Sequence, residues 1–465
     1  MTTALRRVAL VSLGAMGVLA MWLAVQQAIA GSQYRDDPRN IRSVAAEPRR
    51  GVIRTADGVV VAEDVGDGRR YPRRGDYLHL VGYRTPDGGS GLEASRDADL
   101  RPRHDGSITS WLLGLLGANL EPPEVRLTVH DTLQQAAVAG LGGRPGAVVA
   151  LDPRTGAVLT YVSSPTLDPN DLVDGSRSAA EARTDPAALD RVAFRLLPPG
   201  STFKTLVAAA ALDAGMRPGT AFPDRAEYLA PGAGRPIRNA GGGRCGTGSE
   251  ITMRRALAVS CNTVFASLAV ELGGAALAEV GERAGFNVSL PFELGAAVSS
   301  LPGSGDLDAD PGALAQTGLG ERDVRVTPLQ MAVITAGIAN GGVAMRPYVV
   351  DAVVAGDGTE ITSASPDEWR RVFSPRVASA LVAMMVEVVA EGTGRAAGRA
   401  DVVVAGKTGT AEGGGGPHAW FIGFAPAENP TIAIAVVVEG GGAGGSVAAP
   451  IAAAVMEAWF AGSTP

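Results

Sequence analysis

The chain has almost no lysine. Only two of its 41 basic residues are lysines, Lys204 and Lys407, and the other 39 are arginines. Arginine stays charged in proteins, whereas a lysine amine can lose its proton when it is buried or lies beside another cation. The persistence of these two lysines in an arginine-rich chain therefore indicates that both positions need an amine that can be deprotonated.

Cysteine and histidine are also scarce. The two cysteines, Cys245 and Cys261, form no CxxC pair, and the four histidines are scattered along the sequence. Such a pattern offers little material for a metal site, so we expect no metal and no cofactor. The net charge of −7 is unlike the basic excess of nucleic-acid-binding proteins, so we expect no nucleic-acid partner.

A long apolar run lies near the N-terminus. Arg6 and Arg7 precede about twenty mostly apolar residues that end near Val25, a pattern that predicts a single membrane span with the rest of the chain outside the cytoplasm. Ala28-Ile29-Ala30 also has the form of a signal-peptide cleavage site, so a cleaved signal peptide is the alternative. We expect residues 1–30 to be a cytoplasmic stub and transmembrane anchor.

The remaining sequence divides into two parts. Residues 31–124 are polar and turn-rich with short strand-like pieces, which predicts a small, β-rich, juxtamembrane domain without catalytic groups. Residues 125–465 carry strand patterns at both ends and a long, Ala- and Leu-rich, mostly helical insert between them. Strands are expected at 147–151, 157–162, 402–410, 419–425 and 431–439, and helices at 131–141, capped by Asp131 or Thr132, and at 447–460. Short hairpins between the strands predict an α+β domain with one antiparallel sheet covered by helices.

The first chemical motif is Ser201-Thr202-Phe203-Lys204. Pro198-Pro199-Gly200 precedes it and an apolar segment follows, so Ser201 is expected at a helix N-terminus, where free N–H groups favour negative charge. Lys204 then lies one turn away on the same face. A neutral lysine there can take the proton of a serine hydroxyl, which is otherwise a poor nucleophile. Alone, this motif also fits a capped helix with a solvated lysine.

Two further motifs follow in order. Ser260-Cys261-Asn262 falls between two helical stretches and alone reads as a helix-to-helix turn. Lys407-Thr408-Gly409-Thr410 ends a run of β-formers, so Lys407 and Gly409 share one face of a strand and the two threonines the other. Gly409 allows a substrate backbone to approach closely, and an exposed strand edge can bind a peptide as an added strand.

Together, the three motifs resemble those of the penicillin-binding proteins and serine β-lactamases. Flanking stretches such as Gly146–Pro153, Val326–Ala332 and His418–Gly423 resemble class B penicillin-binding proteins. The resemblance implies a transpeptidase domain with a five-stranded antiparallel sheet flanked by helices and an all-helical subdomain. The implied activity is a D,D-transpeptidase that cross-links peptidoglycan stem peptides and is inhibited by β-lactams.

The resemblance also implies a role for each residue. Ser201 attacks the bond between two D-alanines, Lys204 takes its proton, and Ser260 relays a proton together with Lys407. Asn262 holds the peptide amide and orients Lys204. Further roles concern binding: Thr408 and Thr410 hold the terminal carboxylate beside Gly409, and the backbone N–H groups of Ser201 and Thr410 form the oxyanion hole. Expected partners are the membrane, a glycosyltransferase and other cell-wall or division proteins.

Several alternatives stay open. A D,D-carboxypeptidase passes the acyl group to water, and a serine β-lactamase shares the three motifs but needs a group that activates the deacylating water, which the sequence does not identify. Cys245 and Cys261 are expected to form a disulfide in an oxidising compartment, with two free thiols as the alternative. His418 could reach the cleft, but as a residue at a strand end it is expected to face water.

Overall fold

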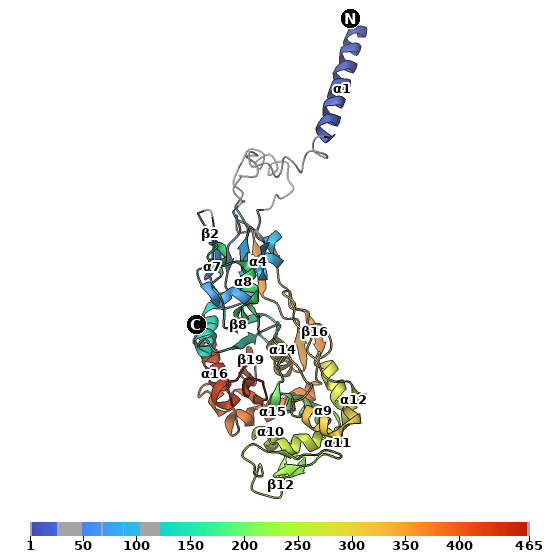
Figure 1. Cartoon of the computed structure of the whole chain (residues 1–465), viewed down its shortest axis with the longest axis vertical. Coiled ribbons are helices and arrows are strands. Elements are labelled where there is room, and N and C mark those ends of the chain that lie inside the picture. The colour runs from blue at the N-terminus through green and yellow to red at the C-terminus, as the bar shows by residue number, and fades with distance from the viewer. Residues whose placement is uncertain (1, 26–48, 67, 87, 103–120, 463–465) are drawn as a thin grey trace. The chain divides into compact units, whose positions relative to one another are not determined.

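The computed structural model describes residues 2–25, 49–66, 68–86, 88–102 and 121–462 (Figure 1). It consists of two compact units, Met1–Arg49 and Arg50–Pro465. In the first, α1 (Thr2–Val25) contains a stretch, Arg6–Leu23, that is long and apolar enough to cross a membrane. The possible cleavage site at 28–30 lies outside the described residues. Two other helices, α11 (Asn262–Arg283) and α16 (Gly444–Gly462), meet the same criteria of length and composition, but both are packed in the second unit.

A six-stranded sheet forms one end of the second unit. Its strand order is β15-β14-β6-β1-β2-β3, and only β1 and β6 pair in parallel. The strands are β1 (Ile53–Arg54), β2 (Val60–Val65), β3 (Gly68–Arg70), β6 (Glu124–Leu127), β14 (Val350–Val354) and β15 (Glu360–Ser363). The sheet therefore combines the β-rich region expected before residue 125 with a hairpin from far along the chain.

A five-stranded antiparallel sheet forms the centre, as the sequence predicts. Its order is β17-β18-β19-β7-β8, so strands from the two ends of residues 125–465 pair directly. The strands are β17 (Ala405–Ala411), β18 (His418–Ala425), β19 (Ile432–Val438), β7 (Gly146–Leu151) and β8 (Val158–Ser164). Among the described residues, β17 pairs with β18 alone, and its other edge has no strand partner there.

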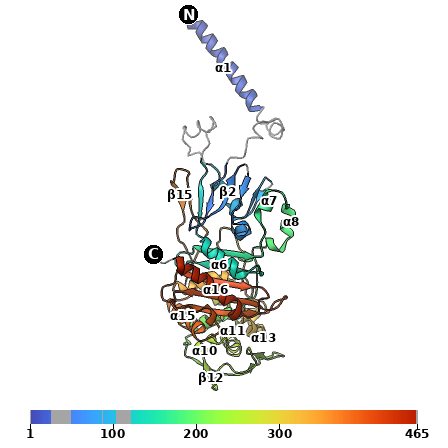
Figure 2. The same cartoon turned by 90° about the vertical axis from the view of Figure 1, so that its left-hand side faces the viewer.

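Helices cover both faces of this sheet. On β19, Ile432, Ile434 and Val436 belong to one apolar cluster, whereas the alternating residues Ala433 and Ala435 belong to the other, as the two-residue period of a strand requires. The first cluster packs against α6 (Asp131–Leu141) and α16 (Gly444–Gly462), which contact each other (Figure 2). The second packs against α14 (Pro328–Ala339). Both faces are thus buried.

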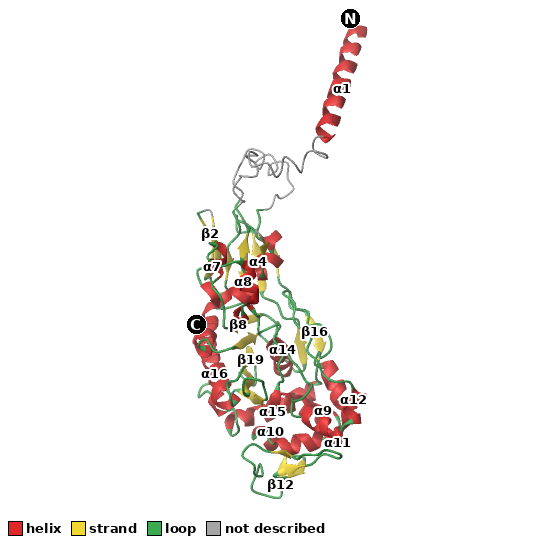
Figure 3. Cartoon of the chain, viewed as in Figure 1, coloured by secondary structure: helices red, strands yellow, loops and turns green. Residues whose placement is uncertain are grey.

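The helical insert gathers beside β17. The central helix α9 (Lys204–Asp213) is buried from Lys204 to Leu212, as expected for a helix that is apolar on all sides. Around it lie α10 (Met253–Ala258), α11 (Asn262–Arg283), α12 (Ser304–Ala309), α13 (Pro311–Thr317) and α15 (Pro375–Ala390). Figure 3 shows these helices grouped at the end of the unit opposite the six-stranded sheet.

The remaining elements are short. They are α3 (Leu78–Val81), α4 (Gly91–Ser95), α7 (Pro169–Val173), α8 (Ala179–Thr184) and the strand pairs β4–β5 (Arg84–Thr85, Gly88–Gly89), β9–β12 (Ala221–Pro223, Glu250–Thr252), β10–β11 (Glu227–Tyr228, Ile237–Arg238) and β13–β16 (Val343–Met345, Glu368–Arg371). Short 3-10 turns connect several of them.

One expected helix cap is wrong. Helix α6 begins at Asp131, but neither Asp131 nor Thr132 caps it. The carboxylate of Asp57 accepts hydrogen bonds from the backbone N–H of Asp131 at 2.9 Å and of Thr132 at 3.2 Å. The cap thus comes from the six-stranded sheet region, and the Asp131 side chain instead accepts from the Tyr77 hydroxyl at 3.0 Å.

Candidate active site

Ser201 lies in a 3-10 turn (Gly200–Phe203) that leads into α9 at Lys204. The sequence predicts an α-helical start at this point, but the first turn is tighter. The Thr202 hydroxyl donates to the Pro199 carbonyl at 2.8 Å. The Thr205 hydroxyl donates to the Thr202 carbonyl at the same distance. These bonds satisfy carbonyls within the tight turn. Ser201 remains partly exposed at the start of a buried helix.

Lys204 is fully buried behind Ser201. Its Nζ donates to Asn262 Oδ1 at 2.7 Å, to the Ser260 carbonyl at 2.9 Å and to Ser260 Oγ at 3.3 Å. Burial, followed by the positive charge of Lys407, holds its pKa well below the ordinary value for lysine. Both causes disfavour the ammonium form, so this amine is set up to lose a proton.

The Ser260 hydroxyl lies between the two lysine amines. Helix α10 ends at Ala258 and α11 begins at Asn262, and Ser260 in the connecting turn adopts a φ of 58°. That left-handed conformation costs a residue other than glycine about 1 kcal/mol or more. Strain of this kind is typical of residues that the surrounding structure holds in a functional geometry.

Lys407 reaches the same hydroxyl from the edge strand β17. Its Nζ donates to Ser260 Oγ at 2.9 Å and to the Thr408 carbonyl at 2.8 Å. The side chain is fully buried, and burial lowers its pKa to about 7. At neutral pH Lys407 is therefore divided between the charged form, which attracts a carboxylate, and the neutral form.

The turn before Ser201 packs on β17. Gly200 has a φ of 54°, and a Cβ added there would lie 2.5 Å from the Thr410 carbonyl oxygen. The Thr410 carbonyl therefore faces this turn, and in an antiparallel strand the N–H of a residue points to the same side as its carbonyl. The backbone N–H of Thr410 is thus directed toward the free edge of β17, where Ser201 lies.

The threonines of β17 have different surroundings. Thr408 is buried and its hydroxyl lies 2.6 Å from the hydroxyl of Thr393, in the loop after α15. Thr410 is exposed. Only the Thr410 side chain is therefore open to solvent, whereas the Thr408 hydroxyl has a partner that the sequence alone does not reveal.

The predicted disulfide is present between Cys245 and Cys261. It ties the loop after β11 to the residue between Ser260 and Asn262. Just before that loop, at the end of β11, the Arg238 carbonyl accepts a hydrogen bond from Asn262 Nδ2 at 2.9 Å. The Asn262 amide is thus held on one side by the end of β11 and on the other by Lys204.

Comparison with known proteins identifies the family to which this chain belongs. The profile of the penicillin-binding protein transpeptidase domain matches residues 146–457. Peptidoglycan D,D-transpeptidase PbpA of Mycolicibacterium smegmatis is 37% identical over 98% of this chain and 99% of its own length. PbpA of Mycobacterium tuberculosis is 35% identical over 99% of this chain and all of its own. The chain belongs to the penicillin-binding protein transpeptidase family.

Solved structures of this family have the same fold. Penicillin-binding protein A of M. tuberculosis, solved as a ceftriaxone acyl-enzyme, matches with a TM-score of 0.82 and 33% identity over 89% of this chain and 98% of that one. A D,D-transpeptidase domain from Eggerthella lenta matches with a TM-score of 0.80 and 35% identity over 90% of this chain and 99% of that one. Asp37-Pro38-Arg39-Asn40 and Arg50-Gly51-Val52-Ile53 resemble penicillin-binding protein A of actinobacteria, and the mycobacterial matches confirm that resemblance.

The expected position of His418 is wrong for this penicillin-binding protein. His418 is buried rather than facing water. Its Nδ1 accepts a hydrogen bond from the Gly440 N–H at 3.1 Å, and a Cβ added at Gly413 would lie 2.3 Å from its Nε2. The glycine-rich loop after β17 therefore folds over the ring, which the strand pattern alone does not predict.

Glu321 is an active-site neighbour that the sequence analysis missed. Its carboxylate interacts electrostatically with Lys204, and it follows Gly320, whose carbonyl accepts from the Gly200 N–H at 2.9 Å. No local signal marks Glu321, because it reaches the site from a loop more than a hundred residues beyond Ser201.

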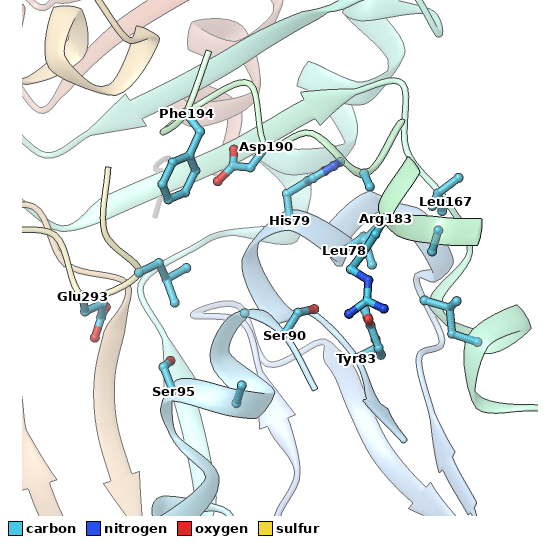
Figure 4. Close-up of a pocket in the computed structure, with 16 residues that line it drawn as sticks. Leu78, His79, Tyr83, Ser90, Ser95, Leu167, Arg183, Asp190, Phe194 and Glu293 are labelled. Carbon is cyan, nitrogen blue, oxygen red and sulfur yellow. The ribbon is translucent and has the colours of Figure 1, made fainter. Parts of the chain in front are cut away.

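An apolar cavity of about 580 Å³ lies elsewhere. It is lined by Leu78 and His79 of α3 and by Asp190 and Phe194 of the segment after α8 (Figure 4). Burial raises the pKa of Asp190 to about 6 and lowers that of His79 to about 4. None of the three motifs contributes to its lining, so the cavity is separate from the site around Ser201.

Proposed function

We propose that the chain is a serine D,D-transpeptidase that cross-links peptidoglycan stem peptides through an acyl-enzyme on Ser201. The observation that carries this proposal is the meeting of two buried amines, from Lys204 and Lys407, at the Ser260 hydroxyl, with Lys204 three residues after Ser201. The named activity of the mycobacterial relatives and the acyl-enzyme structures of penicillin-binding protein A support it.

Acylation begins with proton transfer from Ser201. The three hydrogen bonds of Lys204 account for the three hydrogens of an ammonium, and its lowered pKa favours loss of one of them. The neutral amine takes the Ser201 proton while Oγ attacks the carbonyl carbon of the penultimate D-alanine. The N–H groups of Ser201 and Thr410 stabilise the oxyanion of the tetrahedral intermediate.

Collapse of that intermediate breaks the bond to the last D-alanine. Its nitrogen needs a proton to leave, and Ser260 Oγ is in contact with both amines, which supports a relay from Lys204 or Lys407 through that hydroxyl. The result is an ester on Ser201 and free D-alanine. A second stem peptide then attacks the ester with an amine, Ser201 regains its proton, and a new amide links the two peptides.

Substrate binding is assigned to β17 and Asn262. The exposed Thr410 hydroxyl, the charge of Lys407 and, after a shift from Thr393, the Thr408 hydroxyl bind the terminal carboxylate. Gly409 lets the donor lie against the strand. Asn262 has one Nδ2 hydrogen on the Arg238 carbonyl and a second one available for the donor amide.

We also propose the cellular setting. Residues 1–30 anchor the chain as a single span with the catalytic unit outside the cytoplasm, because Arg6 and Arg7 precede the apolar run. Residues 31–124 form a non-catalytic juxtamembrane part, and residues 125–465 the transpeptidase. A glycosyltransferase supplies the glycan strands, since 94 residues between anchor and catalytic part leave little room for a second enzyme.

Labelling with a fluorescent penicillin tests the nucleophile. The wild type is expected to form a covalent adduct, and Ser201→Ala none, with Ser163→Ala as a control that removes a different serine hydroxyl. Equal labelling of wild type and Ser201→Ala refutes the assignment. Partition of a thioester donor between an added amine and water then separates a transpeptidase from a carboxypeptidase or β-lactamase, because only the former yields mainly the amide.

A further inference from the structure

Glu321 connects the turn before Ser201 with the end of β17. On one side, a Cβ added at Gly320 would lie 2.1 Å from the Gly200 carbonyl oxygen, so this loop packs directly on the residue before Ser201. On the other side, both carboxylate oxygens of Glu321 lie 3.4 Å from the backbone nitrogen of Glu412, the first residue after β17. The carboxylate therefore lies where the active site meets the end of the edge strand.

This carboxylate lacks a cationic partner. Within the part of the chain that the structure describes, Glu321 forms no salt bridge, and Lys204 and Arg325 interact with it only at longer range. Burial and the negative charge of Glu412 outweigh the hydrogen bond from the Glu412 backbone N–H and these cations, and they raise the pKa of Glu321 to about 7. A half-buried carboxylate beside a second one is unfavourable by itself, and a cation from a ligand would relieve that cost.

The proposed function defines which residue of the donor peptide lies beside Glu321. If the donor's terminal carboxylate lies at Thr408 and Thr410 and its attacked carbonyl faces the N–H groups of Ser201 and Thr410, the donor runs antiparallel to β17. Its C-terminus then points toward Lys407 and its preceding residues toward Glu412. Strand residues advance by about 3.3 Å each, so the residue before the two D-alanines comes level with Glu412 and Glu321.

We propose that Glu321 is a specificity-determining residue that selects donors with a positive charge on the residue before D-Ala-D-Ala. The chemical class is a diamino acid with a free side-chain ammonium. The proposal rests on the proposed function, because the path of the donor follows from the roles assigned to Ser201 and β17. Glu412 adds negative charge at the same place and is expected to contribute less, because its side chain is exposed.

Three matched penicillins test this selection. A penicillin is an acyl donor whose acylamino side chain takes the place of the residue before the penultimate D-alanine. The three compounds end in a trimethylammonium group, in its neutral tert-butyl isostere and in a carboxylate, so no probe titrates near neutral pH. The second-order rate constant of Ser201 acylation is measured by intact mass on the full-length protein in detergent at pH 8.

The wild type is expected to react about tenfold faster with the cationic than with the neutral compound, as one partly desolvated charge pair predicts, and slowest with the anionic one. In Glu321→Gln the cationic and neutral compounds are expected to react at rates within about twofold. Glu412→Gln should lose part of the preference. Glu428→Gln, which removes an exposed carboxylate in the turn after β18, should keep all of it.

The pH dependence gives a second measurement on the wild type alone. Below pH 7 Glu321 gains a proton, so the ratio of cationic to neutral rates should shrink from pH 8 to pH 6. Lys204, Arg325 and Glu412 act on this carboxylate as well, and the neutral penicillin corrects for their effect on acylation itself. The ratio, rather than either rate, reports the charge of Glu321.

Two results overturn the inference. One is a wild type without preference for the cationic compound, and the other is an equal preference in Glu321→Gln. If that variant only slows hydrolysis of the acyl-enzyme and keeps the preference, Glu321 activates water and does not select donors. Failure of the proposed function looks different, because then none of the three compounds acylates Ser201. Should Glu321→Gln fold poorly, two measurements still test the inference. Glu321→Asp, which keeps the carboxylate, must retain the preference for the cationic compound, and the wild type must show that preference.

Discussion

The Lys407 ammonium donates to the Ser260 hydroxyl at 2.9 Å across 147 residues of sequence. Lys204 lies 3.3 Å from the same oxygen, so a single hydroxyl connects both lysines of the chain. Burial and the positive charge of Lys407 lower the pKa of Lys204, and burial lowers that of Lys407. This arrangement explains why arginine, which keeps its charge, is not found at either position.

Two substitutions at Ser260 separate chemistry from backbone strain. Ser260→Ala and Ser260→Gly both remove the hydroxyl, so penicillin acylation should slow by about a hundredfold in each, as for loss of a proton-transfer group. Glycine accepts the φ of 58° without strain, so the glycine variant should be more stable than the alanine variant by about 1 kcal/mol. Acylation kinetics and urea unfolding measure the two effects. Acylation at the wild-type rate in either variant contradicts the relay.

The buried amine of Lys407 should make stability depend on pH. Its pKa is about 7 in the folded protein against an ordinary 10.5, because burial disfavours the charged form. Between these values the unfolded chain binds a proton that the folded chain does not, so the free energy of unfolding rises with pH. The free energy of unfolding of the wild type, minus that of Lys407→Met, should therefore rise by about 1.4 kcal/mol per pH unit from pH 7.5 to 9. Urea unfolding measures both free energies. If they change with pH by the same amount in wild type and Lys407→Met, the pKa of Lys407 is not lowered.

The disulfide should contribute to both stability and acylation. Cys245 and Cys261 are 16 residues apart, and closing a loop of that size stabilises a fold by about 3 kcal/mol. The loop that carries Cys245 follows β11, whose last residue, Arg238, holds Asn262 through its carbonyl, a hydrogen bond worth about 1 kcal/mol. The double variant with serine at both cysteines should therefore be less stable and be acylated about fivefold more slowly. An unchanged rate constant at a temperature where the variant is folded means that the loop does not position Asn262.

The catalytic groups could be predicted from the sequence because each of the three motifs combines its chemistry with a local structural signal. A proline-glycine turn precedes Ser201, a break between helices surrounds Ser260, and a run of β-formers leads to Lys407. The central sheet was predictable for a similar reason, because its hairpins are short and its strands apolar.

Features that depend on distant pairing were not predictable. β14 and β15 join a sheet whose other members lie more than 200 residues earlier, and no pattern within 350–363 identifies that partner. Glu321 and Thr393 likewise reach the site through packing of loops. His418 was expected to face water because it begins a strand, but the glycine-rich loop before it covers the ring. Local sequence describes an element, whereas its neighbours are set by the whole fold.

The cap on α6 provides the last prediction, because it joins the six-stranded sheet region to the transpeptidase. The residue at the N-cap position, His130, makes no capping bond with its side chain, and Asp57 satisfies the first two N–H groups instead. Asp57→Ala should lower the free energy of unfolding by about 1 kcal/mol, and Asp57→Asn by less, because its amide oxygen still accepts one bond. Penicillin acylation should not change in either, since the cap touches none of the groups around Ser201. Urea unfolding with parallel acylation assays checks both statements, and an Asp57→Ala variant as stable as the wild type shows that the carboxylate is not the cap.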